Sequence, residues 1–302
     1  MKTHLRGLIL SLPLCALFAA SHALATGNVI ANSRISVDFD DPSTGLFTGD
    51  ADRVDSITWI DSSGNSTGNL AADSYNNTYC NDADEFFGEA EGEPDEAQPP
   101  LMVTVGEVST WTGVNALTGK TATTGRDCNN NKLSGKTKTM YRLSAAKARI
   151  NELQVTRTFQ FNSKTQDFSN SGLRAVMARL PLSPYHYVLL PNSSGVVTTY
   201  DSNNCGAPCE VTDWDGKWIA DDDGNGNGMV IIRSSASTAP AIAVIDSDGF
   251  SNSNVSSVVL EQPGGGWKAA VKEVEYLCFY DSTSWTATQQ NAGQLPQGCA
   301  GP

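Results

Sequence analysis

The stretch from Leu153 to Phe161, LQVTRTFQF, carries the clearest structural signal in the sequence. Apolar residues occupy nearly every second position, and most of the residues are β-branched or aromatic, which is typical of a β-strand with one buried face. Side chains alternate between the two faces of a strand, so Leu153, Val155 and Phe159 share one face with Arg157. We therefore predict a strand that packs this face against a hydrophobic core and carries one charge on it.

The same period of two recurs along the chain, between clusters of Gly, Asn, Asp and Ser that predict turns. Only residues 144–151 (SAAKARIN) have the pattern of a short helix. Many strands at short spacing indicate an all-β class, and we expect a single large antiparallel β-sandwich or supersandwich with disulfides. The expected strands lie within residues 34–39, 54–60, 101–108, 153–161, 196–200, 229–233, 242–245, 255–260 and 271–280.

The first 25 residues have the three parts of a secretory signal peptide. Lys2 and Arg6 give a positive start, residues 8–19 are mostly apolar, and Ala23-Leu24-Ala25 has the small residues of a cleavage site. The apolar run is shorter than the ~20 residues that a transmembrane helix needs, so we expect no membrane anchor. We expect an exported protein, either periplasmic or extracellular.

Removal of the signal peptide, residues 1–25, would leave residues 26–302, which we expect to form a single all-β domain. This mature chain carries 18 basic and 33 acidic residues, and hence a net charge of −15. A surface of that charge repels nucleic acid phosphates, so nucleic acid is not an expected partner.

Six cysteines remain in the mature chain, and an even number in an exported protein favours disulfides. Six cysteines allow fifteen pairings. Pairing of sequence neighbours predicts Cys80–Cys128, Cys205–Cys209 and Cys278–Cys299. A zinc site is not expected, because the mature chain has one histidine and no paired CxxC motifs.

Two features offer candidate catalytic residues. His186, the single histidine of the mature chain, lies between Tyr185 and Tyr187. It is either a general base with phenolic acids beside it or a half-buried strand residue that is hydrogen-bonded to the backbone. Arg157 also has two interpretations. A charge among apolar neighbours is either paired with a carboxylate or lines a ligand groove, where it would stabilise negative charge.

The run Asp221-Asp222-Asp223-Gly224-Asn225-Gly226 fits the opening of a calcium-binding loop, in which alternate oxygens converge on the ion. Ile232 stands where an EF-hand would have its bidentate Glu, so a remote carboxylate would have to complete the site. The alternative is a plain hairpin turn that needs Gly and Asn for their backbone freedom. Calcium is thus a candidate cofactor, with Asp221, Asp223, Asn225, Asp213 and Asp215 as candidate ligands.

Two tryptophans lie immediately before this acidic run, Trp214 and Trp218 in the segment DWDGKW. Aromatic rings stack on the apolar faces of sugars, and neighbouring carboxylates and amides bind hydroxyl groups. The pair is therefore a candidate ligand-binding platform for a glycan, with ordinary packing in the sheet as the alternative.

Residues 29–39 (VIANSRISVDF) and 53–60 (RVDSITWI) resemble the opening strands of galactose-mutarotase-like β-supersandwich proteins. The later segment VTRTFQF, residues 155–161, is similar to a strand in the middle of such domains. The resemblance implies a supersandwich fold and an association with carbohydrate. Epimerases of this superfamily use two histidines and a late acidic base, whereas this mature chain has one histidine, so epimerase activity is not expected.

Three functional hypotheses follow. The first is an exported carbohydrate-binding or carbohydrate-associated protein with a glycan or polysaccharide as its partner. The second is a polysaccharide-degrading enzyme, in the first place a lyase and otherwise a glycoside hydrolase, in which Tyr185, His186 or Tyr187 takes a proton and Arg157 stabilises the resulting charge. The third is a secreted structural protein without a small ligand.

Overall fold

The computed structural model describes residues 29–39, 54–68, 70, 90–92, 101–102, 110–126, 132–161, 173–175, 184–201, 204, 209–211, 213–236, 242–246, 255–259 and 271–302. Nearly all regular structure in these segments is β-strand, which confirms the predicted all-β class. Within the described part of the chain, none of the helices has the length and hydrophobicity that a membrane span requires.

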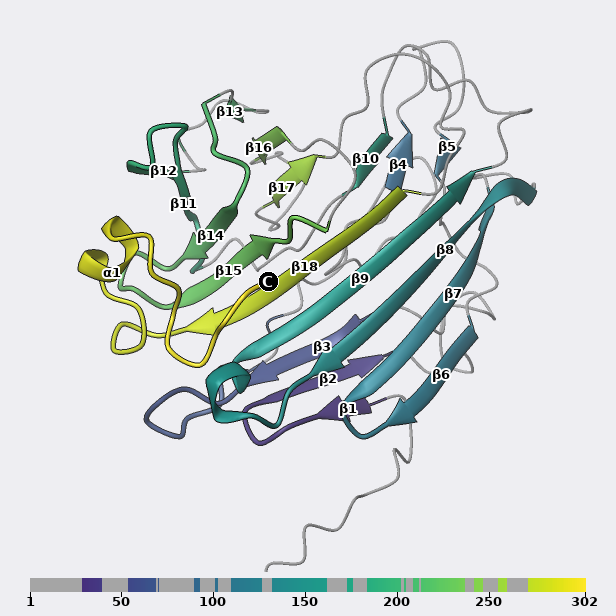
Figure 1. Cartoon of the computed structure of the whole chain (residues 1–302), viewed down its shortest axis with the longest axis horizontal. Coiled ribbons are helices and arrows are strands. Elements are labelled where there is room, and N and C mark those ends of the chain that lie inside the picture. The colour runs from purple at the N-terminus through teal and green to yellow at the C-terminus, as the bar shows by residue number, and fades with distance from the viewer. Residues whose placement is uncertain are drawn as a thin grey trace, which may run out of the picture.

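The largest element is a nine-stranded antiparallel sheet, which crosses Figure 1 diagonally. Its strands pair with neighbours in space rather than strictly in sequence, so that β15 joins the late strand β18, which in turn pairs with β9. In spatial order the strands are β12 (Val197–Asp201), β11 (Tyr187–Pro191), β14 (Trp218–Asp222), β15 (Gly228–Arg233), β18 (Val271–Tyr280), β9 (Glu152–Phe161), β8 (Lys132–Leu143), β7 (Thr118–Arg126) and β6 (Thr110–Asn115).

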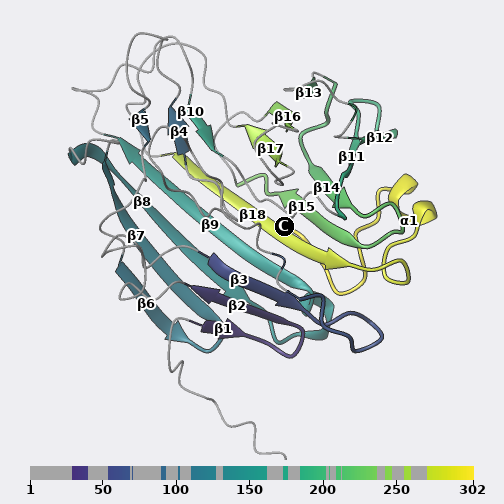
Figure 2. The ribbon, with the colours of Figure 1, turned by 180° about the vertical axis from the view of Figure 1, so that it is seen from behind.

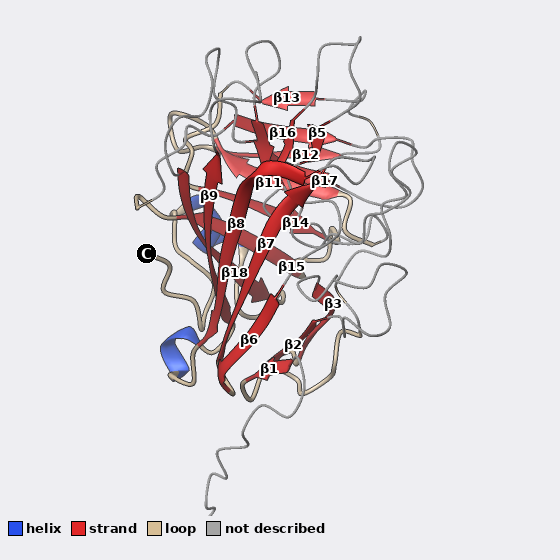
Figure 3. Cartoon of the chain, turned by 90° about the vertical axis from the view of Figure 1, so that its right-hand side faces the viewer, coloured by secondary structure: helices blue, strands red, loops and turns tan. Residues whose placement is uncertain are grey.

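Three small antiparallel sheets accompany the large one. The most N-terminal of them, formed by β1, β2 and β3, lies behind the large sheet in Figure 1 and in front of it in Figure 2. Figure 3 shows this small sheet and the large sheet as separate layers. The small sheets are β1 (Val29–Ala31), β2 (Ile35–Phe39) and β3 (Val54–Trp59); β10 (Leu173–Ala175), β4 (Ala90–Gly92) and β5 (Leu101–Met102); and β13 (Cys209–Val211), β16 (Ile242–Asp246) and β17 (Val255–Val259).

The first hydrophobic core lies between the β1–β3 sheet and one face of the large sheet. Leu153 and Val155 are fully buried there, as the alternation in β9 predicts. Phe39 of β2 packs on Tyr141 of β8, with 4.7 Å between ring centroids. The side chains of Arg157 and its neighbours Phe159 and Phe161 lie outside what the structure describes.

The opposite face of the large sheet is covered by the C-terminal segment, residues 281–302, which packs over a second core. The anchor of this segment is Trp285, which is 1% exposed and contacts both Trp218 and Tyr280 edge-on. The indole nitrogen of Trp285 donates to the backbone oxygen of Gln294 at 2.7 Å, which fixes the loop that follows helix α1 (Ala287–Asn291).

Sequence patterning located the helices poorly. Residues 144–151 contain only a short 3-10 turn, Lys147–Arg149, instead of the predicted short helix. Helix α1 was not predicted, because five residues are too few to show a 3.6-residue period. Its start is marked by a capping box in which Thr286 and Gln289 hydrogen-bond each other's backbone N–H groups.

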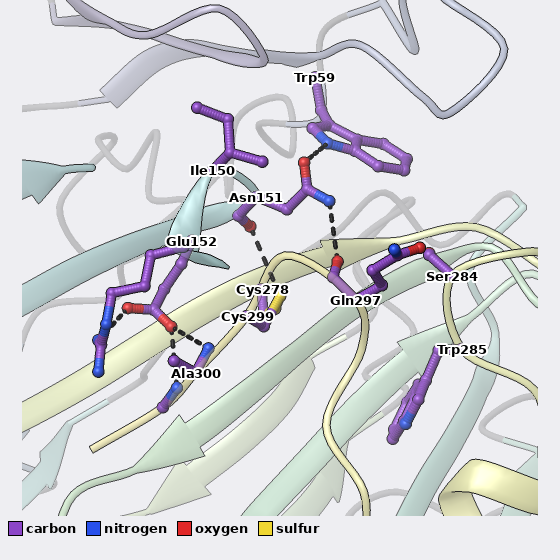
Figure 4. The surroundings of a disulfide bond; sticks show 12 residues. Trp59, Ile150, Asn151, Glu152, Cys278, Ser284, Trp285, Gln297, Cys299 and Ala300 are labelled. Carbon is purple, nitrogen blue, oxygen red and sulfur yellow. Dashed lines mark hydrogen bonds and ion pairs between the residues drawn. A yellow bond between two sulfur atoms is a disulfide. The ribbon is translucent and has the colours of Figure 1, made fainter. Parts of the chain in front are cut away.

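A disulfide and a buried carboxylate hold the end of the C-terminal segment (Figure 4). Cys278 of β18 is bonded to Cys299, as sequence proximity predicts, with 6.1 Å between the Cα atoms. Glu152 accepts hydrogen bonds from the backbone N–H groups of Ala300 and Gly301, both at 2.9 Å, and pairs with Arg149 at 2.6 Å. The other predicted disulfides, Cys80–Cys128 and Cys205–Cys209, lie outside the described side chains.

The start of the C-terminal segment is held by Asp281. Its carboxylate accepts hydrogen bonds from the backbone N–H of Ser62, from both donors of Thr283, and from the N–H of Ser284. Burial acts to raise the pKa of Asp281, but the hydrogen bonds from Ser62 and Thr283 outweigh it and hold that pKa well below its usual range.

Replacing Cys278 and Cys299 together by Ala should lower the free energy of unfolding by about 3 kcal/mol, because the disulfide closes a loop between positions 21 residues apart. Urea unfolding of the variant and the unaltered protein would measure the difference. An unchanged midpoint would show that the rest of the segment holds itself in place without the disulfide.

Asp281→Asn should destabilise the protein at neutral pH by about 2 kcal/mol, because an amide cannot accept from every donor that the carboxylate satisfies. The pKa of Asp281 in the folded protein lies below the unfolded value of about 3.9, so its carboxylate stabilises the fold above that pH. This stabilisation is lost as the pH falls toward the folded-state pKa. Acid unfolding below about pH 4 should therefore be shallower in the variant. Equal acid dependence in both proteins, followed by circular dichroism, would contradict the role of Asp281.

Candidate functional site

A cavity of about 570 Å³ opens on the face of the large sheet that carries the C-terminal segment. Four segments enclose it: the β11–β12 hairpin, the loop that enters β14, the end of β15, and the C-terminal segment. Its volume falls in the range of sites for small ligands in proteins. The cavity therefore depends on the same C-terminal segment that covers the second core.

The wall of the cavity is apolar. Trp218, Ile232, Val197 and Leu295 line it, and all four belong to the second core or pack against it. Trp218 packs edge-on against Trp285, with 5.3 Å between ring centroids, so the position of its ring is fixed by the core. This arrangement gives a ligand a rigid hydrophobic surface rather than an adjustable one.

The rim of the cavity is polar and charged. Asp215 lies 3.0 Å from the Lys217 ammonium, and its other oxygen accepts from the backbone N–H of Lys217 at 2.9 Å. The backbone N–H of Asp215 donates to Pro191 at 3.0 Å, which ties this loop to β11. Gln290 of helix α1 and Ser234 after β15 complete the polar rim. The rim thus offers donors, acceptors and one ion pair close to the apolar wall.

The two tryptophans predicted as a glycan platform do not form one. Trp218 is only 7% exposed and belongs to the second core, whereas Trp214 packs against the first core. The indole nitrogen of Trp214 donates to the backbone oxygen of Trp218 at 2.8 Å, so Trp214 supports the loop that enters β14. Trp218 keeps a place at the cavity wall, but two exposed stacking rings side by side are not present.

The acidic run folds as the turn between β14 and β15. Asp223 accepts from the N–H groups of Asn225 and Asn227, and Asp222 accepts from those of Gly224 and Gly226. Gly224 and Gly226 have φ values of 78° and 87°, which other residues rarely adopt. Asp221 is 1% exposed within β14.

The predicted calcium ligands fall into two groups at opposite ends of β14. Asp213 and Asp215 precede that strand and hydrogen-bond Ser193 and Lys217, whereas Asp221, Asp223 and Asn225 lie at its far end. A five-residue strand is about 16 Å long, so neither remote carboxylate can complete a site at the turn. No group of three metal-ligating side chains occurs among the residues described. Calcium binding stays a prediction.

Strand pairing brings the segment Tyr185–Tyr187 to the acidic turn. Tyr187 is opposite Asp222 in the sheet, and a Cβ atom at Gly224 would lie 2.5 Å from the Tyr187 ring. His186 packs against Tyr187 with the two rings tilted by 40° and 4.2 Å between ring centroids, and its Nδ1 lies 3.0 Å from the backbone oxygen of Pro184. Burial, together with the charges of Asp223 and Asp222, raises the pKa of Tyr185.

Arg157 is far from this tyrosine segment. It is opposite Glu273 and Thr139, whereas Tyr187 shares its row across the sheet with Tyr280, seven residues further along β18. The separation is about 23 Å along the strands and about 19 Å across the four strand spacings. Arg157 and Tyr185–Tyr187 therefore do not form one catalytic set.

Sequence reasoning missed two deeply buried glutamates. Glu275, opposite Arg233, is 1% exposed, and Glu152 is 3% exposed. It also missed the cavity residues of the C-terminal segment, because nothing in their pattern shows that this segment folds back on the sheet. Its one usable signal was the spacing of Cys278 and Cys299.

The best-defined polar pair near the turn is Tyr280 and Asp222. The buried Tyr280 hydroxyl donates to Asp222 at 2.8 Å. Burial raises the pKa of Asp222, and the hydrogen bonds from Tyr280 and from the amides of Gly224 and Gly226 offset part of that rise. Burial and the Asp222 charge in turn raise the pKa of Tyr280 well above its usual value.

No protein-family model matches the sequence, and no curated protein matches it either. Among solved structures, the chain is similar to a protein of Escherichia coli K12 assigned as an aldose 1-epimerase, with a TM-score of 0.44 and 10% identity over 84% of this chain and 98% of that chain. It is also similar to an α-N-acetylgalactosaminidase from Bifidobacterium bifidum, with a TM-score of 0.48 and 12% identity. That match covers 84% of this chain and 36% of the glycosidase. Both likenesses concern the fold alone.

Tyr280→Phe should raise the pKa of Asp222 further and destabilise the protein at neutral pH by about 1–2 kcal/mol, because the carboxylate loses a buried donor. Because the pKa of Asp222 is higher in the folded than in the unfolded protein, the free energy of unfolding rises as the pH falls through the folded-state pKa. The loss of stability in Tyr280→Phe should therefore shrink in mild acid. An NMR titration of the Asp222 carboxyl carbon would measure the shift. Tyr276→Phe, on the same strand face, is the matched control and should leave that titration unchanged.

Proposed function

We propose that the protein is exported and binds glycan in the cavity walled by Trp218 and Leu295. The observation that carries this proposal is the combination of a rigid apolar wall with a polar rim around about 570 Å³. Sites for small ligands typically combine an apolar lining with a few well-placed polar groups.

The chemistry of the rim suits hydroxyl groups. A sugar hydroxyl both donates and accepts hydrogen bonds, and the rim supplies an acceptor in Asp215, a donor in Lys217 and both in Gln290. The C–H faces of a sugar ring match the apolar wall, in which Val197 and Leu295 are partly exposed in front of the buried Trp218. Arg233 also lines the cavity, beside the Asp215–Lys217 ion pair.

Export is supported by two separate features. Residues 1–25 have the pattern of a signal peptide, and the disulfide between Cys278 and Cys299 is of the kind that persists in oxidising compartments. Both the periplasm and the extracellular medium satisfy these features. Polysaccharides are accessible in either location.

Catalysis is not part of the proposal. The lyase hypothesis needs Arg157 beside the tyrosine segment Tyr185–Tyr187, and the strand register separates them. The cavity itself is lined by neither. Binding without turnover is therefore the function that the described geometry supports best.

The purified protein should be retained on at least one member of a panel of immobilised neutral and acidic polysaccharides. Gln290→Ala should weaken binding of the retained glycan about fivefold, because one rim hydrogen bond of roughly 1 kcal/mol is lost. Isothermal titration with oligosaccharides of that glycan would measure the change. Mass spectrometry of the same mixtures would reveal any turnover.

Asn291→Ala is the matched control, since Asn291 is the next residue of helix α1 and does not line the cavity. It should bind as the unaltered protein does. Retention on no glycan would favour a structural role, and an unaltered affinity in Gln290→Ala would place the glycan outside this cavity.

A further inference from the structure

A second cavity, of about 470 Å³, lies at the other side of the C-terminal segment. Three parts of the chain that are far apart in sequence enclose it: the β2–β3 sheet with Arg34 and Trp59, the connection from β8 to β9 with Lys147 and Asn151, and the C-terminal segment with Asp281 and Gln297. None of these residues lines the glycan cavity.

Hydrogen bonds fix the three parts to each other. The side chain of Asn151 accepts from the indole nitrogen of Trp59 at 3.2 Å and donates to the backbone oxygen of Gln297 at 3.0 Å, as Figure 4 shows. The side chain of Asn32 donates to the backbone oxygens of Ser144 and Ile150, at 2.8 and 3.1 Å. The cavity is therefore a built feature of the fold rather than a gap between independent loops.

The lining of this cavity carries two cations and one carboxylate. Arg34 donates to the backbone oxygens of Ile60 and Asp61, and Lys147 is exposed. Within the described part of the chain, neither cation makes an ion pair. The one carboxylate in the lining, Asp281, already accepts four hydrogen bonds from neighbouring protein groups.

The chain as a whole is acidic, with 33 acidic and 20 basic residues. Most of its surface should repel an anion, so a site with positive charge would attract one selectively. A guanidinium and an ammonium are also the groups that bind carboxylates through charge-assisted hydrogen bonds.

We infer that this cavity binds a small hydroxylated carboxylate, such as a sugar acid, with Lys147 and Arg34 holding the carboxylate. The hydroxyl-binding groups are the side chains of Ser62 and Gln297, and the walls of Trp59 and Ile150 contact the body of the ligand. This site is independent of the proposed glycan cavity, because the two share no lining residue.

Isothermal titration of the purified protein with D-glucuronate and D-galacturonate would test the site, with D-glucose and D-galactose as neutral counterparts. At least one uronate should bind at least tenfold more tightly than its neutral counterpart. Its affinity should fall as salt is added, because exposed charges are screened.

Lys147→Gln should weaken uronate binding about tenfold, which corresponds to roughly 1.4 kcal/mol. Lys147 is exposed and, within the described part of the chain, makes no ion pair that holds the fold, so the variant should unfold as the unaltered protein does. Lys138→Gln makes the same charge change on an exposed part of β8 and should leave binding unchanged. Gln290→Ala, in the glycan cavity, should also bind uronate normally.

Three results would overturn the inference. One is a failure of both uronates to bind, and another is equal binding of uronates and neutral sugars. The third is uronate binding that Lys147→Gln does not weaken. None of these depends on whether the protein is retained on a polysaccharide, so the two cavities are tested separately.

Discussion

The burial of Trp285, which anchors the C-terminal segment to the large sheet, is the interaction on which both cavities depend. The large sheet has two apolar faces, and the β1–β3 sheet covers only one of them. Trp285 fills the other face by contacting Trp218 and Tyr280, and the disulfide at Cys299 keeps the end of the segment from separating. An aromatic residue of this size removes a large apolar area from water, so the segment is held by hydrophobic burial before any polar contact is counted.

The route of this segment explains why polar groups gather on either side of it. After Trp285 the chain turns through helix α1 and returns across the sheet, where Glu152 accepts from Ala300 and Gly301. Glu152 is 3% exposed, and a buried carboxylate requires such partners. Outside helix α1 this segment has no regular structure, so it places backbone and side-chain polar groups at the surface of an apolar core. Cavities with an apolar wall and a polar rim are the expected result.

Local alternation predicted four strands of the large sheet, β9, β12, β15 and β18, but not β6, β7, β8, β11 and β14. Leu153 and Val155 are buried on the predicted face, and the nearest-neighbour rule paired Cys278 with Cys299 correctly. The platform of Trp214 and Trp218 was wrong, because both rings pack inward. In β14, the alternation of side chains places Trp218 on the same face as Ala220, and this alone indicates that Trp218 belongs to the core. The contribution of the C-terminal segment to the cavities could not be predicted, since it depends on contacts between distant parts of the chain.

Arg157 shows how strand register changes the interpretation of a charge. Alternation places it on the face of Leu153, and in β18 the same alternation places Glu273 and Glu275 on the face of Leu277. The register sets Glu273 opposite Arg157 and Glu275 opposite Arg233, so inward positions on neighbouring strands carry opposite charges. Opposite charges across a strand pair compensate each other, whereas a lone buried charge is costly. The side chains of Arg157 and Glu273 lie outside what the structure describes, so both interpretations of Arg157 stay predictions. An acidic residue at an inward position of another strand should therefore be sought before a ligand is invoked for such an arginine.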